Sequence, residues 1–183
     1  MKKNKCLLLT GLFFIIIQLN AQDSTKHPVQ IDKISIGMGG GIDFGGFGYN
    51  LLVYPNKNIG LFAGGGYAIA GLGYNVGIKV RCFINKTSSK VTPYMLAMYG
   101  YNAAIEVNLD DKYNKLFYGY SVGCGIDFRP NPKKNSYWSF SILIPFRKAE
   151  LYTYMDYLEN HSVTFIMKPP PFLISISTRA IIK

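Results

Sequence analysis

The chain has 183 residues and a formal net charge of +10, yet only 16% of its residues are charged. It contains 14 Tyr, 12 Phe and 19 Gly. This length favours a single domain. An aromatic and glycine-rich composition with little charge is typical of strands and not of helices. No stretch offers about 20 uninterrupted apolar residues, which excludes a protein that crosses a membrane with helices.

The first 21 residues have the pattern of a secretory signal peptide. Three lysines precede an apolar run from Cys6 to Ile17, and a short polar stretch follows, with cleavage expected near Ala21 or Gln22. The apolar run is too short to span a bilayer as a helix. We therefore divide the chain into a signal peptide (1–21), a polar N-terminal leader (22–30) and a β-barrel (31–183).

Eight segments of the remaining chain alternate large apolar residues with small or polar ones. Val76, Ile78 and Val80, for example, are separated by Gly77 and Lys79. A period of two residues predicts strands, and most of the segments reach the roughly 9 to 11 residues of a tilted membrane strand. An even number of strands closes an up-and-down barrel. The segments are 34–44, 47–55, 58–69, 71–84, 92–107, 115–128, 136–147 and 172–183.

The face opposite the large residues consists mainly of glycine and serine with a few charges. A soluble barrel would expose this face to water, where glycine weakens strands and sparse charge gives poor solubility. Inside an eight-stranded barrel, small residues leave room for a few long polar side chains. The large residues then form an outward apolar band, as lipid requires. An all-β, eight-stranded antiparallel transmembrane barrel is the fold that we predict.

Residues 31–183 resemble the small eight-stranded outer-membrane barrels of the OmpA/OmpX type, among the porin-like barrels of Gram-negative bacteria. The resemblance rests on the signal peptide, the strand count, the alternation and the unequal loops. Segments such as "YGYNAAIEV" and "ILIPFR" are similar to strands of this family. The resemblance implies chain ends in the periplasm. The connections at 108–115 and 148–171 are then the large outer loops. It also implies insertion by the barrel assembly machinery and contact with outer-membrane lipid.

Charged residues on the inward parity predict a polar network in the lumen. Charges enclosed by a narrow barrel are expected to form salt bridges and hydrogen bonds across it. Such a network is interpreted as a structural plug. A narrow, anion-preferring pore is the alternative, because cations outnumber acids in the set. The predicted network residues are Asp43, Lys79, Arg81, Glu106, Asp127, Arg147 and Arg179.

Two cysteines remain after removal of the signal peptide, Cys82 and Cys124. Both fall on the lipid-facing parity of the fourth and sixth strands, with the fifth strand between them. Two inter-strand spacings amount to about 9.5 Å, which a disulfide cannot span. We predict two free thiols that are buried in the bilayer.

The last outer loop is the segment whose composition exceeds what a connection requires. Helical spacing of its apolar residues predicts a short amphipathic helix or a tyrosine-rich flap over 149–159. Exposed Tyr and Met are typical contact residues, so the loop is a candidate interaction surface; packing on the barrel mouth or the lipid interface is the alternative. The candidate residues are Leu151, Tyr152, Tyr154, Met155 and Tyr157.

The sequence gives little support for catalysis, metal binding or nucleic-acid binding. His161 and Ser162 lie near Asp156 and Glu159, but loop residues of these types are often adjacent by chance, so we expect no enzyme. His27 is the only other histidine, and no metal site or cofactor is predicted. The glycine-rich segments lack the context of a phosphate loop, and the basic residues lack interleaved stacking aromatics, so no nucleic acid is expected.

We therefore expect a non-enzymatic outer-membrane barrel with a structural or surface-interaction role. Its expected partners are outer-membrane lipid, the barrel assembly machinery, and an extracellular or envelope partner at the last outer loop. A narrow pore for small solutes is the second reading. A soluble periplasmic ligand-binding barrel is the third.

Overall fold

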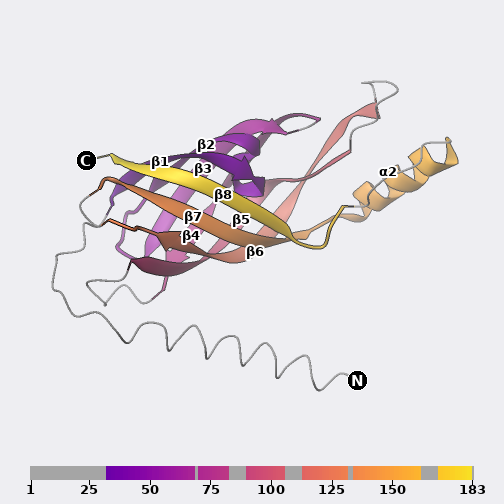
Figure 1. The fold of residues 1–183 in the computed structure, drawn as a ribbon. Helices are drawn as coiled ribbons and strands as arrows, with labels where there is room; N and C mark the ends of the chain where they lie inside the picture. Colours follow the sequence, from indigo (N-terminus) through magenta and orange to yellow (C-terminus); the bar gives the residue numbers. More distant parts are fainter. Residues whose placement is uncertain are drawn as a thin grey trace, which may run out of the picture. The chain divides into compact units, whose positions relative to one another are not determined.

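The structure is a computed structural model that describes residues 32–68, 70–82, 90–105, 113–131, 134–161 and 169–182. Eight strands form a closed barrel in the order β1 to β8, each antiparallel to its neighbour (Figure 1). This confirms the predicted all-β, up-and-down architecture. The elements are β1 (Ile34–Gly41), η1 (Ile42–Phe44), β2 (Gly46–Val53), β3 (Ile59–Ala68), β4 (Gly71–Arg81), β5 (Val91–Ile105), β6 (Lys115–Phe128), β7 (Ser136–Phe146), α2 (Ala149–Asn160) and β8 (Leu173–Ile182).

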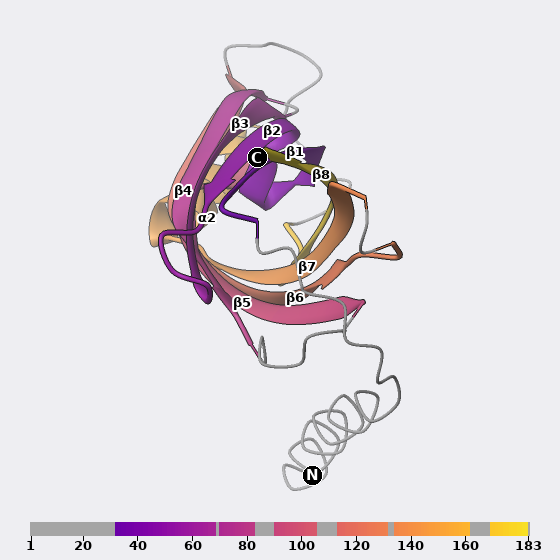
Figure 2. The same ribbon diagram turned by 90° about the vertical axis from the view of Figure 1, so that its left-hand side faces the viewer.

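The barrel closes where its first and last strands meet. Ile34 of β1 pairs with Ile182 of β8, and the ladder continues to Gly40 and Ile176. Figure 2 shows the strands as a ring seen from this end. We call this the terminal end, and the opposite end, which carries η1 and α2, the loop end. The connections β2–β3, β4–β5 and β6–β7 all lie at the terminal end.

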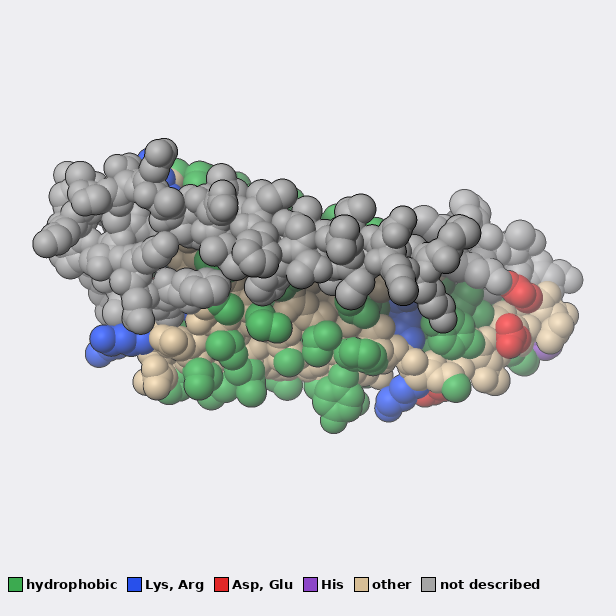
Figure 3. All heavy atoms as spheres, turned by 90° about the horizontal axis from the view of Figure 1, so that it is seen from below, with side chains coloured by type: hydrophobic (Ala, Val, Ile, Leu, Met, Phe, Trp, Pro, Cys, Tyr) green, Lys and Arg blue, Asp and Glu red, His purple; other side chains and the backbone are tan. Residues whose placement is uncertain are grey.

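The large apolar residues of the alternating segments face outward, as the pattern predicts. On β4 the predicted set from Leu72 to Val80 is exposed, while Asn75, Lys79 and Arg81 are buried. Similar rows cover the other strands, and part of this apolar surface is visible in Figure 3. A surface of this size and continuity is characteristic of contact with lipid or with another protein.

Two segments depart from the predicted alternation, the first at the end of β1. Ile42 and Phe44 were predicted to face outward, but both are buried, because η1 turns the chain into the barrel. Gly45 ends this turn with φ 68°, a backbone conformation that side-chain-bearing residues rarely adopt. The strand therefore ends at Gly41, and a helical turn replaces its expected continuation.

The second departure lies in β5 beyond Gly100. A β-bulge between Tyr101 and Ala103 shifts the register with β6, so the residues after it change face. Ala103 and Ile105, predicted to face outward, are buried beneath α2. Glu106, predicted to face the lumen, lies outside the described residues.

The glycine-rich inner face makes room for backbone as well as for side chains. A Cβ on Gly37 would lie 2.9 Å from Arg179 Nη1, and one on Gly60 would lie 2.7 Å from the Tyr54 ring. A Cβ on Gly66 would instead lie 2.6 Å from the Phe44 carbonyl oxygen of η1. The inner glycines thus leave the predicted space for long side chains. Some of them also leave space for the backbone of the η1 turn.

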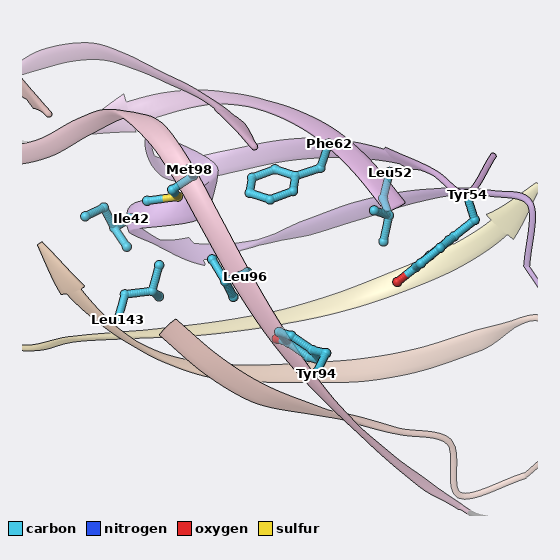
Figure 4. Packing of buried hydrophobic residues seen from close by; sticks show 8 residues of the cluster. All are labelled: Ile42, Leu52, Tyr54, Phe62, Tyr94, Leu96, Met98 and Leu143. Carbon is cyan, nitrogen blue, oxygen red and sulfur yellow. The ribbon is translucent and has the colours of Figure 1, made fainter. Parts of the chain in front are cut away.

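The lumen also contains an apolar cluster that the sequence analysis did not anticipate. Its members converge from β2, β3, β5, β7 and η1, as Figure 4 shows. Apart from Ile42 of η1, these residues occupy the same inward parity as the polar ones, so the interior is a packed core with a polar part. The cluster consists of Ile42, Leu52, Tyr54, Phe62, Tyr94, Leu96, Met98 and Leu143.

Candidate functional site

The strongest ion pair in the lumen joins Arg81 to a residue that precedes the first strand. Asp32 accepts two hydrogen bonds from the Arg81 guanidinium, at 2.6 Å from Nη1 and 3.0 Å from Nη2. Tyr137 Oη donates to Asp32 at 2.9 Å, and the Tyr54 ring lies 3.8 Å from the guanidinium carbon. This two-point geometry gives the pair more directional strength than a single contact would.

Lys79 and Asp127 form a second pair next to the first. Lys79 Nζ lies 2.7 Å from Asp127 Oδ1 and 3.6 Å from the centroid of the Tyr94 ring. Ser139 donates a hydrogen bond to the same carboxylate. The other oxygen of Asp127 is 3.6 Å from Arg81 Nη2, so the two pairs are contiguous.

Arg179 and Asp43 line a small cavity together with Lys79. Arg179 donates to Asn50 Oδ1 at 2.9 Å and to Ser35 Oγ at 3.4 Å. Asp43, carried by η1, accepts a hydrogen bond from Ser175 of β8. Among the described residues, the three buried cations Lys79, Arg81 and Arg179 are thus accompanied by the carboxyl groups of Asp32, Asp43 and Asp127.

The structure separates Arg147 from this network. Arg147 follows β7 at the loop end, half-buried, and donates to the Pro169 carbonyl oxygen at 3.2 Å. It was grouped with the lumen residues because it continues the inward parity of β7. The strand ends at Phe146, however, so parity no longer fixes the direction of the next side chain.

Several functional residues of the lumen were missed from the sequence. Asp32 lies before the first alternating segment, where no periodicity marks an inward position. Asn50 and Asn75 lie on inward parity but carry no charge. Both fix η1 by hydrogen bonds to its backbone. Asn50 Nδ2 donates to the Asp43 carbonyl oxygen at 3.0 Å, and Asn75 Nδ2 donates to the Ile42 carbonyl oxygen. Inward parity is the signal that could have found both.

The last outer loop folds into a helix that packs on the extended β5–β6 hairpin. The predicted helix over 149–159 is confirmed as α2, Ala149–Asn160. Its Leu151, Met155 and Leu158 are buried against Ala103, Ile105 and Phe117. Leu151 and Met155 are therefore not available to a partner, contrary to their inclusion in the interaction surface, because they form the buried stripe of an amphipathic helix.

Polar contacts fix the same helix. Tyr154 Oη donates to the Tyr113 carbonyl oxygen at 2.8 Å, and the Tyr154 ring packs beside Phe117. Lys115 Nζ donates to Glu150 Oε1 at 2.9 Å, and this hydrogen bond lowers the pKa of the Glu150 carboxyl below its usual range. Tyr152 and Tyr157 remain 54% and 46% exposed.

The Tyr154 hydrogen bond makes a measurable contribution to docking of α2. In Tyr154→Phe the ring contact is retained and the buried acceptor loses its donor, which costs about 1 kcal/mol. We expect amide hydrogen exchange of 151–158 to become about fivefold faster. Tyr157→Phe, at an exposed position of the same helix, is the control. Equal exchange in both variants would contradict a docking role for the Tyr154 hydroxyl.

The two cysteines are free, as predicted, with Cys82 half-buried and Cys124 exposed. His161 Nδ1 lies 2.8 Å from the Tyr157 carbonyl oxygen, and its ring packs on the Tyr157 ring. Over the described ranges, no group of three His, Cys, Asp or Glu side chains could hold a metal ion. Across the same ranges, no helix has the length and apolar character needed to cross a membrane.

Comparison with known proteins finds similarity at the level of structure. No family model and no curated protein matches the chain. The crystal structure of the N-terminal β-barrel domain of Pseudomonas aeruginosa OprF is similar with a TM-score of 0.50 and 9% identity, covering 80% of this chain and 95% of that domain. A structure from the de novo design of transmembrane β-barrels gives a TM-score of 0.47 and 12% identity, covering 87% of this chain and 100% of that one. The predicted resemblance to small eight-stranded outer-membrane barrels is confirmed for the fold.

Proposed function

We propose that the chain is a non-enzymatic integral outer-membrane barrel with a structural or surface-interaction role. Its terminal end faces the periplasm, and its loop end faces the cell exterior. The apolar outer surface supports insertion, because a barrel in water would expose rows of Ile, Leu, Val and Tyr around its circumference. The β-barrel fold shared with the N-terminal domain of Pseudomonas aeruginosa OprF supports the same proposal.

The filled lumen is the observation that supports a structural role over transport. Two contiguous ion pairs occupy its terminal end, the apolar cluster follows, and η1 fills the space toward the loop end. The cavity lined by Asp43, Lys79 and Arg179 leaves room for about one water molecule. A continuous aqueous path would need several of these buried side chains to move together.

The surface-interaction part of the role is assigned to α2. Its buried stripe and the Tyr154 contact hold it on the β5–β6 hairpin, so its outer face is presented in a fixed orientation. Tyr152 and Tyr157 supply exposed aromatic area of the kind that is enriched in protein interfaces. An extracellular or envelope partner would therefore meet a preformed surface.

Conductance separates the plug from the pore. Purified protein reconstituted in a planar bilayer is expected to show no discrete conductance steps, because the described ion pairs, apolar cluster and η1 occupy the lumen. Detergent without protein is the control for leakage. Reproducible steps that scale with protein concentration would contradict the plug and support a narrow pore.

Membrane insertion is tested by extraction. The exported chain is expected to stay in the envelope fraction in sodium carbonate and in high salt, and to be released by detergent, since its outer apolar surface contacts lipid. Release by carbonate alone would contradict insertion and favour a soluble periplasmic barrel.

A further inference from the structure

Exposed cations ring the terminal end of the barrel. Each connection at this end carries at least one, as does the residue that precedes β1. Four of them are exposed lysines and one is a half-buried arginine. Because the connections alternate around the barrel, the positive charge is spread over the whole rim. We call this set the basic rim; it consists of Lys33, Lys57, Lys90, Arg129 and Lys134.

In the part of the chain that the structure describes, no exposed acidic side chain lies at the terminal end. Asp32 and Asp127 lie at the same end, but both are buried and paired with lumen cations. Across the described ranges, the exposed acidic residues are Glu150, Asp156 and Glu159, all on α2. Figure 3 shows blue side chains at one end of the barrel and both blue and red ones toward the other. Among the described residues, the exposed charge of the terminal end is therefore positive, whereas that of the loop end is mixed.

Main-chain hydrogen bonds hold the basic rim in place. Tyr54 N donates to the Lys33 carbonyl oxygen at 2.7 Å, and Arg129 N donates to the Lys90 carbonyl oxygen at 2.7 Å. Lys134 N donates to the Asn131 carbonyl oxygen at 3.1 Å. These four residues thus extend from a hydrogen-bonded backbone.

Aromatic residues lie immediately next to the basic rim on the apolar surface. Trp138 of β7 pairs with Phe128 of β6, one strand position from the connection that carries Arg129, and is 46% exposed. The Trp138 ring stacks on the ring of Phe140 of the same strand. Amphipathic aromatic rings next to exposed cations are typical of the level at which lipid headgroups begin.

We propose that the basic rim binds anionic phospholipid headgroups of the leaflet that faces the chain ends, with phosphatidylglycerol as the matching chemistry. This proposal rests on the membrane insertion proposed above. Lys and Arg at headgroup level attract anionic lipid, and attraction decays within about 10 Å at 0.1 M salt. A ring of exposed lysines at this level therefore enriches anionic lipid around this end and fixes the depth of the barrel.

The single tryptophan of the chain, Trp138, reports on the lipid at this position. The folded protein is placed in vesicles of phosphatidylcholine and phosphatidylglycerol, with bromine on the acyl chains of one lipid or the other. Bromine quenches tryptophan only on contact, so the two measurements give the relative occupancy of each lipid. We expect about threefold enrichment of phosphatidylglycerol over its bulk fraction, falling toward none in 0.5 M NaCl.

A four-site variant tests the assignment to the basic rim. Lys33→Gln, Lys57→Gln, Lys90→Gln and Lys134→Gln together are expected to abolish the enrichment while leaving quenching by brominated phosphatidylcholine unchanged. Arg129 is left intact because it lies 5.3 Å from the Tyr137 ring, beside the lumen network. Single-site Lys148→Gln, at the loop end, is the matched control for Lys134→Gln in the β6–β7 connection that leads to Trp138, and only the latter should reduce the enrichment.

The outcomes separate this inference from the proposed function. Equal occupancy of both lipids in the unmodified protein would overturn the inference and leave insertion intact. Enrichment that survives the four-site variant would also overturn it. Absence of quenching by either brominated lipid would overturn insertion itself, and the inference with it.

Discussion

Replacing Asp32 with asparagine is expected to lower the free energy of unfolding of the barrel by about 3 kcal/mol. The change leaves the Arg81 guanidinium buried with only the more distant Asp127 carboxylate, at 3.6 Å, in place of its two-point partner. Breaking a buried ion pair from one side is costly because the remaining charge has been removed from water. Urea unfolding in lipid vesicles measures the loss.

Two further variants define the origin of this effect. Combining Asp32→Asn with Arg81→Met removes both charges, so the double variant is expected to be more stable than the sum of the single losses predicts. Glu150→Gln breaks the exposed pair with Lys115 and should leave the unfolding midpoint unchanged. If Asp32→Asn changed stability no more than Glu150→Gln does, the buried pair would have no special role.

Gly66→Val is expected to lower the free energy of unfolding of the barrel by about 3 kcal/mol or more. This is the upper end of the range for adding a side chain to a tightly packed site. A Cβ at Gly66 would lie 2.5 Å from the Phe47 carbonyl oxygen and 2.6 Å from that of Phe44. Both atoms belong to the backbone, which cannot rotate away as a side chain can. The measurement is again urea unfolding in vesicles, with the fraction folded read from gel mobility before heating.

Gly65 supplies the control, because it is adjacent to Gly66 on β3 and faces outward. A Cβ there would be 3.9 Å from its nearest neighbour, the Gly73 carbonyl oxygen. Gly65→Val is therefore expected to change stability little, since β-branched residues suit an outward strand position. Similar losses for the two variants would show that strand glycines matter here for a reason other than space for η1.

The outer surface of the barrel could be predicted from sequence because a single rule governs it. Strand side chains alternate, so the positions of Val76 and Ile78 determine that of Val80 without knowledge of strand pairing. The same rule placed Lys79, Arg81 and Asp127 inside. Which of them pair depends on the register across β5, and no local pattern in the sequence encodes that register.

The remaining errors arise where alternation ends. Asp32 lies before β1, η1 replaces the end of that strand, and the bulge after Tyr101 changes the face of Ala103. The apolar lumen was missed for another reason. Leu52 and Phe62 have the inward parity, but the large apolar residues of the other parity form a longer series. The pattern therefore predicts a polar interior and does not reveal the apolar residues within it.

The η1 turn also has a consequence for the order of assembly. It lies inside the ring of strands, and the Ser175 hydroxyl of β8 lies within hydrogen-bond distance of both the Asp43 side chain and the Gly40 carbonyl oxygen. Because β8 also pairs with β1, the strand that leads into η1, closure of the seam and fixation of the turn depend on the same strand. A change that weakens the β1–β8 seam is therefore expected to loosen the turn inside the barrel as well.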